Sequence, residues 1–187
     1  MQTILHWDHA LLKLINYQWQ NDFFDFLMPW LRNATAWAPL YFFLGLFILA
    51  NYKKTGWWCI VSIALTVVLT NYVSSNLIKE NIARLRPCNN PDLAGWLRVL
   101  VPYRPQSSSF VSSHAANHFC MATFLFLVLK DEIGKWALLF FVWALSICYA
   151  QMYVGVHYPI DVTCGAIIGI LIGYLAGTLF NKKIALA

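Results

Sequence analysis

The residues best suited to chemistry in this 187-residue chain lie between long apolar runs. Residues 150–161 join two such runs and contain His157 and Asp161. Pro159 lacks a backbone N–H and therefore suits the first turn of a helix. His157 would then lie just before a helix N-terminus, where the helix dipole favours a bound anion. Asp161 follows four residues later and is placed to bind one imidazole nitrogen, which fixes the tautomer and leaves the other nitrogen free to attack.

A histidine in this position is not by itself evidence for catalysis. The chain is 60% hydrophobic and 11% charged, whereas average soluble domains carry about 25% charged residues. Together with a mean hydropathy of +0.58, this composition predicts an integral membrane protein. Near the end of a membrane helix, a histidine is more often an interfacial residue than a nucleophile. The chemical interpretation of His157 therefore depends on whether other reactive side chains reach the same place.

The elements that must position these residues are helices in a membrane. Five apolar runs exceed the roughly 17 residues that a spanning helix needs; they cover about residues 35–51, 56–77, 113–129, 136–153 and 160–180. Residues 1–20 are amphipathic and include Trp7 and Trp19, so we expect a helix lying on the membrane. The predicted fold is all-α, a polytopic transmembrane helix bundle with about five spanning helices plus an N-terminal interfacial amphipathic helix. We expect one membrane-embedded domain over residues 1–187, with an N-terminal interfacial segment at 1–32 and a long site-bearing loop at 78–112.

Two further patterns indicate packing rather than chemistry. The last run contains glycines four residues apart, a spacing typical of closely packed membrane helices: Gly165, Gly169, Gly173 and Gly177. The five cysteines show no metal-ligand spacing and are interpreted as packing residues. The net charge is a modest +5, and the basic residues lie between the apolar runs. This pattern favours positively charged membrane loops and anion binding over a nucleic-acid partner.

Helices that alternate in direction place four reactive segments at one face of the bundle. These are the end of the second run, the start of the third, the end of the fourth and the start of the fifth. They contain Lys79 and Arg86, then Ser112, Ser113 and His114, then Gln151, then His157 and Asp161. One or two such coincidences are unremarkable in a membrane protein, but four on the same side favour a shared site.

Each of these segments also has a simpler interpretation. Lys79 and Arg86 are seven residues apart, which predicts one helical face with Pro87 ending the helix; a pair of snorkelling charges would look the same. Ser112 and Ser113 precede a helix and are ordinary caps, although the free N–H groups of a helix start also bind phosphate oxygens.

Together the residues suit phosphoryl transfer. The cations and backbone N–H groups would hold the transferring oxygens. One histidine would attack phosphorus and the other would protonate the leaving oxygen. No carboxylate cluster suggests a Mg²⁺ site, so we expect neither a metal nor another cofactor.

These residues resemble the type 2 phosphatidic acid phosphatase superfamily, whose signature is KxxxxxxRP, PSGH and SRxxxxxHxxxD. Lys79 through Arg86-Pro87 matches the first motif completely. Val111-Ser112-Ser113-His114 matches the second at Ser and His, and Ala150-Gln151 followed by His157 and Asp161 matches the third at its spacing, His and Asp. The resemblance covers about residues 79–161.

The resemblance implies a role for each matching residue. His157 would be the nucleophile that forms a phosphohistidine, Asp161 would orient it, and His114 would be the general acid. Lys79, Arg86, Ser112, Ser113 and Gln151 would hold the phosphate. Gln151 stands where the family has Arg and brings no charge, so either catalysis is weaker or Arg84 or Arg104 supplies the missing cation.

The resemblance also implies a lipid phosphate substrate within a membrane. Six lysines lie on the face opposite the site in the five-span arrangement, which makes that face the better cytoplasmic candidate: Lys53, Lys54, Lys130, Lys135, Lys182 and Lys183. The site would then face the periplasm or exterior of a bacterial inner (cytoplasmic) membrane. The small size resembles that of bacterial undecaprenyl pyrophosphate phosphatases, so undecaprenyl pyrophosphate is the favoured substrate; phosphatidylglycerophosphate, phosphatidate and lipid A phosphates are the alternatives. The non-enzyme alternative is a lipid-phosphate binding or transport protein, and the sequence does not determine the oligomeric state.

Overall fold

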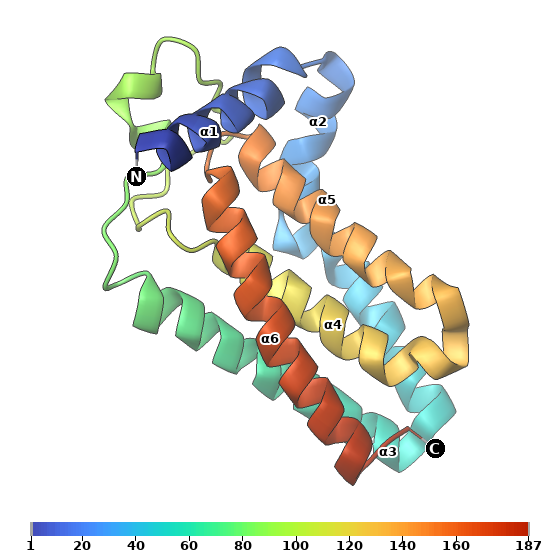
Figure 1. Cartoon of the computed structure of the whole chain (residues 1–187). Helices are drawn as coiled ribbons and strands as arrows, with labels where there is room; N and C mark the ends of the chain where they lie inside the picture. The colour runs from blue at the N-terminus through green and yellow to red at the C-terminus, as the bar shows by residue number, and fades with distance from the viewer. Residues whose placement is uncertain (1, 187) are drawn as a thin grey trace.

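A computed structural model describes residues 2–186, and over this range the ordered elements are helices (Figure 1). The longer ones are α1 (Gln2–Lys13), α2 (Asp22–Leu31), α3 (Ala38–Tyr72), α4 (Ser113–Ile133), α5 (Leu139–Tyr153) and α6 (Pro159–Lys183). Single turns of π-helix extend α1 and α3, at Leu14–Gln18 and Val73–Ile78. Short 3₁₀-helices occupy Ala34–Trp37, Pro87–Asn89, Pro91–Leu93 and Gly134–Leu138. The predicted all-helical membrane fold is confirmed.

Within residues 2–186, three helical segments are long and apolar enough to cross a membrane: Ala34–Ile78, Ser113–Tyr153 and Pro159–Lys183. The first doubles back at Lys53, whose φ of 44° and ψ of −116° are not helical, so α3 consists of two arms (Figure 1). The second is interrupted by the 3₁₀ turn that begins at Gly134, where φ is +56°. Both reversals lie where the sequence predicts a turn between apolar runs, and five crossings remain the prediction.

Helices α4 and α6 form the closest contact in the bundle, while α3 and α5 pack on the other sides of α4. A Cβ atom on Gly165, Gly169 or Gly173 would lie 2.2–2.5 Å from a backbone carbonyl oxygen of α4 or its cap. The helix backbones therefore touch along this stripe, as predicted from the glycine spacing. This contact sets the position of the N-terminus of α4 relative to that of α6.

The two N-terminal helices cover the end of the bundle to which the long loop also belongs (Figure 1). One face of α1 is buried, including Leu12 and Asp8, whereas Ile4 and Trp7 on the other face are exposed. The Asn21 side chain accepts a hydrogen bond from the Phe24 N–H at 2.9 Å and caps α2. An apolar exposed face is what a helix at a membrane surface requires.

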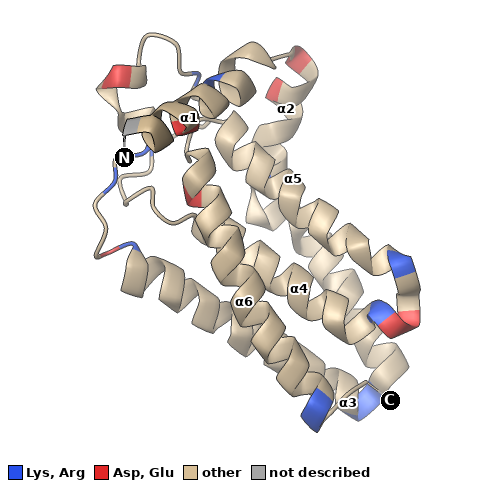
Figure 2. Cartoon of the chain, in the orientation of Figure 1, with Lys and Arg blue, Asp and Glu red and all other residues tan. Residues whose placement is uncertain are grey.

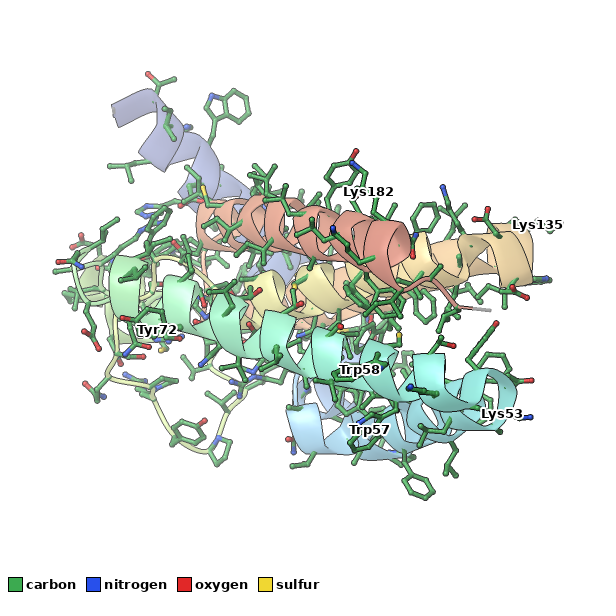
Figure 3. The ribbon with its side chains drawn as sticks, turned by 90° about the horizontal axis from the view of Figure 1, so that it is seen from below. Lys53, Trp57, Trp58, Tyr72, Lys135 and Lys182 are labelled. Carbon is green, nitrogen blue, oxygen red and sulfur yellow. The ribbon has the colours of Figure 1, made fainter. Side chains whose placement is uncertain are left out.

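Charged residues are confined to the two ends of the bundle (Figure 2). Figure 3 shows Lys53, Lys135 and Lys182 at one end and Tyr72 toward the other. Trp57, about one turn beyond Lys53, is 56% exposed, and Trp136 is 64% exposed. Tryptophan beside lysine at a helix end is typical of a membrane–water interface.

Replacing Gly169 by alanine tests the helix contact. The added methyl group would meet the Ala116 carbonyl oxygen at 2.2 Å, so α4 and α6 must separate. We expect Gly169→Ala to destabilise the protein by about 1–3 kcal/mol, measured as a lower Tm in detergent. The matched control is Gly45→Ala, because a Cβ there meets no atom within 4 Å. Equal Tm values for both variants would contradict the packing argument.

Candidate active site

His157 lies in the turn between α5 and α6 and is 2% exposed. Gly155 makes this turn possible, since its φ is +80° and a Cβ would lie 2.5 Å from the Arg98 carbonyl oxygen. Pro159 occupies the first turn of α6, as predicted. The His157 Nδ1 atom faces the Asp161 Oδ2 atom at 3.5 Å, which is the pairing that the four-residue spacing suggests.

Asp161 is fully buried and holds several elements together through its two oxygens. Its Oδ2 atom accepts hydrogen bonds from the Tyr158 N–H at 3.0 Å and from the Ser109 hydroxyl. Its Oδ1 atom accepts a hydrogen bond from Arg84 Nη1 at 2.5 Å. The Asp161 carbonyl oxygen also accepts from the Ser112 N–H at 3.0 Å, which joins the start of α6 to the start of α4.

Arg84 links Asp161 to α1. Its second nitrogen binds the buried Asp8 carboxylate at 2.5 Å, and the guanidinium lies 4.0 Å from the centre of the Tyr158 ring. Asp8 in turn accepts the Ile160 N–H at 2.9 Å. Asp8 and Ser109 belong to no sequence motif that would indicate this role, because no spacing pattern connects residues so distant along the chain.

Arg86 reaches the other side of His157. Its Nη1 atom donates to the His157 Nε2 atom at 3.0 Å and to the Val156 carbonyl oxygen at 3.2 Å. Ser107 fixes the guanidinium by accepting from Nε and Nη2. Because Nε2 accepts this bond, the ring proton belongs on Nδ1, facing Asp161. That tautomer leaves the Nε2 lone pair available as a nucleophile.

The prediction that Lys79 and Arg86 share one helical face is wrong. The helical turn ends at Ile78, and Arg86 has extended backbone angles of −70° and 153°. Pro87 favours this conformation, because the helical region is disfavoured for a residue before proline. The extended segment carries Arg86 inward to His157, a placement that a continuous helix would not provide.

The N-terminus of α4 brings the second group of predicted residues to the same end. The Ser112 hydroxyl accepts from the Ala115 N–H at 3.4 Å and caps the helix. Lys79 Nζ donates to the Ser113 hydroxyl at 3.2 Å. His114 is half-buried and lies within electrostatic range of His157 and Lys79.

Burial shifts the pKa values of two groups outside the spanning segments. Burial lowers the pKa of His157 to about 4, although the Asp161 carboxylate beside it acts in the opposite direction. Burial also lowers the pKa of Lys79 to about 8, and the nearby Arg86 guanidinium contributes to that shift. At neutral pH the imidazole of His157 is therefore uncharged, as a nucleophile must be, while most of Lys79 carries its charge.

Gln151 is fully buried at the end of α5, and both polar atoms of its amide have no hydrogen-bond partner among the described residues. Neither arginine considered as its substitute is placed to act as one. Arg84 is balanced by two carboxylates, and Arg104 is exposed and lines a different cavity, together with Cys88. A buried amide without a partner costs about 1–3 kcal/mol per group, so a ligand atom would be favourable there.

Within residues 2–186, no three His, Cys, Asp or Glu side chains are grouped so that they could hold a metal ion. The described site instead combines two imidazoles with cations and a helix N-terminus. Such an arrangement is able to hold a phosphoryl group and attack it with a neutral nitrogen.

The helical membrane fold and the grouped histidine, lysine and arginine side chains are those expected of a membrane-embedded phosphatase. Residues 55–185 match the PAP2 superfamily, and the chain belongs to this family. It is 33% identical over 169 residues to the lipid A 4'-phosphatase of Bacteroides thetaiotaomicron, covering 88% of this chain and 73% of that protein. It is 31% identical over 172 residues to the undecaprenyl-diphosphatase of Sulfolobus acidocaldarius, covering 89% and 75%.

Solved structures show the same fold. LpxE of Aquifex aeolicus aligns with a TM-score of 0.62 and 26% identity, over 89% of this chain and 92% of that one. The PAP2-type phosphatidylglycerolphosphate phosphatase of Bacillus subtilis aligns with a TM-score of 0.72 and 20% identity, over 98% and 89%. The protein is therefore an integral membrane lipid phosphatase of the PAP2 superfamily.

The shifted pKa of Lys79 predicts an alkaline limit to activity. As a predicted phosphate-binding residue, Lys79 must be protonated to act, and it loses its charge as the pH rises through about 8. We expect kcat/KM to fall above that pH. Lys79→Arg should move the fall to higher pH, because arginine stays charged. The measurement is kcat/KM from pH 5 to 10, with the exposed Lys182→Arg as control. An unmoved alkaline limb in Lys79→Arg would contradict the assignment.

Proposed function

We propose that His157 attacks the phosphorus atom of a lipid phosphate and forms a phosphohistidine. The observation that supports this most strongly is the placement of His157 between Asp161 on Nδ1 and Arg86 on Nε2. Asp161 keeps the proton on Nδ1 and stabilises the positive charge that develops on the ring. A phosphoryl group that enters between Nε2 and Arg86 meets the nucleophile and a cation at once.

The reaction then proceeds in two displacements. A bond forms between His157 Nε2 and phosphorus while the bond from phosphorus to the lipid oxygen breaks. His114 gives its proton to that leaving oxygen. In the second step a water molecule, deprotonated by His114, attacks the phosphohistidine and releases inorganic phosphate. After the second step, His114 and His157 have returned to their starting protonation states.

The remaining site residues would bind the oxygens that carry charge in the transition state. Arg86 and Lys79 supply cations, and the Ser113 N–H begins a helix whose dipole favours anions, whereas the Ser112 N–H already binds the Asp161 carbonyl oxygen. The unpartnered Gln151 amide is a further donor. These interactions are strongest where water is excluded, and His157, Arg86 and Gln151 are all buried.

For the lipid, we propose lipid A carrying a phosphate monoester. The support is the similarity to the lipid A 4'-phosphatase of Bacteroides thetaiotaomicron and, at 26% identity, to that of Porphyromonas gingivalis. Undecaprenyl pyrophosphate, favoured by the sequence analysis, is the second candidate because the Sulfolobus acidocaldarius undecaprenyl-diphosphatase is 31% identical. A binding protein without turnover is disfavoured by the complete set of His157, Asp161 and His114.

We also propose that the protein lies in a bacterial inner membrane with the site facing the periplasm or exterior. The support is the distribution of lysine. The end of the bundle that carries Lys53, Lys135 and Lys182 is opposite the site, and lysine-rich ends favour the cytoplasm (Figure 3).

The two histidines should give different kinetic signatures. His157→Ala should abolish phosphate release from lipid A and from undecaprenyl pyrophosphate in detergent, because no nucleophile remains. His114→Ala should slow the hydrolysis of an alkyl phosphate by about 10²-fold or more. It should slow the hydrolysis of p-nitrophenyl phosphate much less, since nitrophenolate leaves without a proton. Helix content measured by circular dichroism is the control for folding. Turnover by His157→Ala, or equal losses for the two substrates in His114→Ala, would exclude the corresponding role.

Two exposed aspartates at opposite ends test the orientation. In a variant without the native cysteines, Asp92→Cys should react with an impermeant maleimide from the periplasmic side of spheroplasts. Asp131→Cys, which is also exposed, should react only after the membrane is opened. The reverse labelling pattern would place the site in the cytoplasm.

A further inference from the structure

A cavity of about 320 Å³ lies beside His114. Arg32, Tyr103 and Pro102 are among the residues that line it, whereas Lys79, Arg86 and His157 are not. The cavity therefore adjoins the site on the His114 side only. Its walls come from the end of α2 and from the long loop, so it exists only where these two segments meet.

Among the described residues that line this cavity, Arg32 is the only lysine or arginine. It follows the last residue of α2, where the Leu31 carbonyl oxygen accepts a hydrogen bond from Trp37 Nε1 at 2.8 Å. Trp37 also packs on Trp143 of α5, with ring centres 5.9 Å apart. The backbone that carries Arg32 is thus fixed against the bundle.

The charge of Arg32 is not balanced within the described part of the chain. Arg84 and Arg98 pair with carboxylates, but Arg32 forms no ion pair there. Its Nε atom is buried without a hydrogen-bond partner, and Arg32 interacts electrostatically with Arg86 and Tyr103. Two neighbouring guanidinium groups in a partly buried site are unfavourable unless an anion lies near them.

The proposed reaction shows which part of a substrate meets Arg32. In an in-line displacement the nucleophile and the leaving oxygen lie on opposite sides of phosphorus. With His157 as nucleophile and His114 as acid, the leaving oxygen is at His114. Whatever is attached to that oxygen extends past His114, and the cavity that contains Arg32 begins there.

We infer that Arg32 binds a second anionic group on the leaving side of the substrate and is a specificity-determining residue. This inference rests on the proposed function. It predicts a preference for lipids with a further negative charge close to the scissile bond. That charge is either the inner phosphate of a diphosphate or a separate acidic substituent of the headgroup.

A pair of substrates with the same lipid chain isolates this role. Farnesyl diphosphate loses its terminal phosphate and leaves farnesyl phosphate, an anion, whereas farnesyl phosphate leaves neutral farnesol. We expect Arg32→Gln to lower kcat/KM for the diphosphate about tenfold or more and to change the monophosphate less than about threefold. Arg32→Lys should keep part of the preference because it keeps the charge.

Arg104→Gln is the matched control, since Arg104 is exposed and belongs to the other cavity. It should leave the ratio of the two kcat/KM values unchanged. Equal losses for both farnesyl substrates in Arg32→Gln, or no loss for either, would overturn the inference. A second pair, lipid A with two phosphates and lipid A with the 4'-phosphate alone, shows whether a separate acidic group serves as the second anion.

A binding measurement keeps this test independent of the proposed function. Methylenediphosphonate carries two linked anionic groups and no hydrolysable bond, while inorganic phosphate carries one. Calorimetry should show that Arg32→Gln weakens the binding of methylenediphosphonate about tenfold and changes the binding of inorganic phosphate little. If the wild type hydrolyses no lipid but this difference is found, the proposed function fails and the role of Arg32 stands. If Arg32→Gln binds both compounds as the wild type does, the role of Arg32 is wrong whatever the lipid activity.

Discussion

The buried carboxylate of Asp161 is the interaction on which the site depends. It faces His157, binds Ser109, Arg84 and its own helix start, and through its carbonyl oxygen it is joined to the cap of α4. A buried carboxylate is stable in such surroundings because its oxygens accept hydrogen bonds from Tyr158, Ser109 and Arg84. Removing one partner of a buried ion pair typically costs about 3–5 kcal/mol, so the network also fixes the position of the nucleophile.

The close contact of α4 and α6 makes this network possible. The glycines of α6 allow the two helix backbones to touch, and the first of them, Gly165, lies against the Ser112 carbonyl oxygen. Ser112 and Asp161 are therefore held within one hydrogen bond of each other. The glycine contact between α4 and α6 therefore also determines where Ser112 and Asp161 lie at the end of the bundle.

The arginines of the site divide into two groups according to their partners. Arg84 and Arg98 pair with carboxylates and tie the N-terminal helices to the bundle. Arg86 and Arg32 have no carboxylate partner among the described residues and lie beside the two catalytic histidines proposed here. A cation without a protein counter-charge is available to a phosphate, whereas one that is already paired contributes mainly to structure.

The sequence by itself determined the helical membrane fold, the turns between apolar runs, the glycine contact and the reactive end of the bundle, because hydrophobic length, proline and glycine spacing act locally. It also paired His157 with Asp161, since four residues span one helical turn. Only the tertiary structure decided that Arg86 is extended rather than helical and that Asp8 and Ser109 support Asp161. Only the tertiary structure also places Arg32 beside His114, because Arg32 follows the end of α2, more than eighty residues before His114 along the chain. These contacts join segments distant in sequence, and no local spacing encodes them until α4 and α6 are packed and the N-terminal helices are placed over their ends.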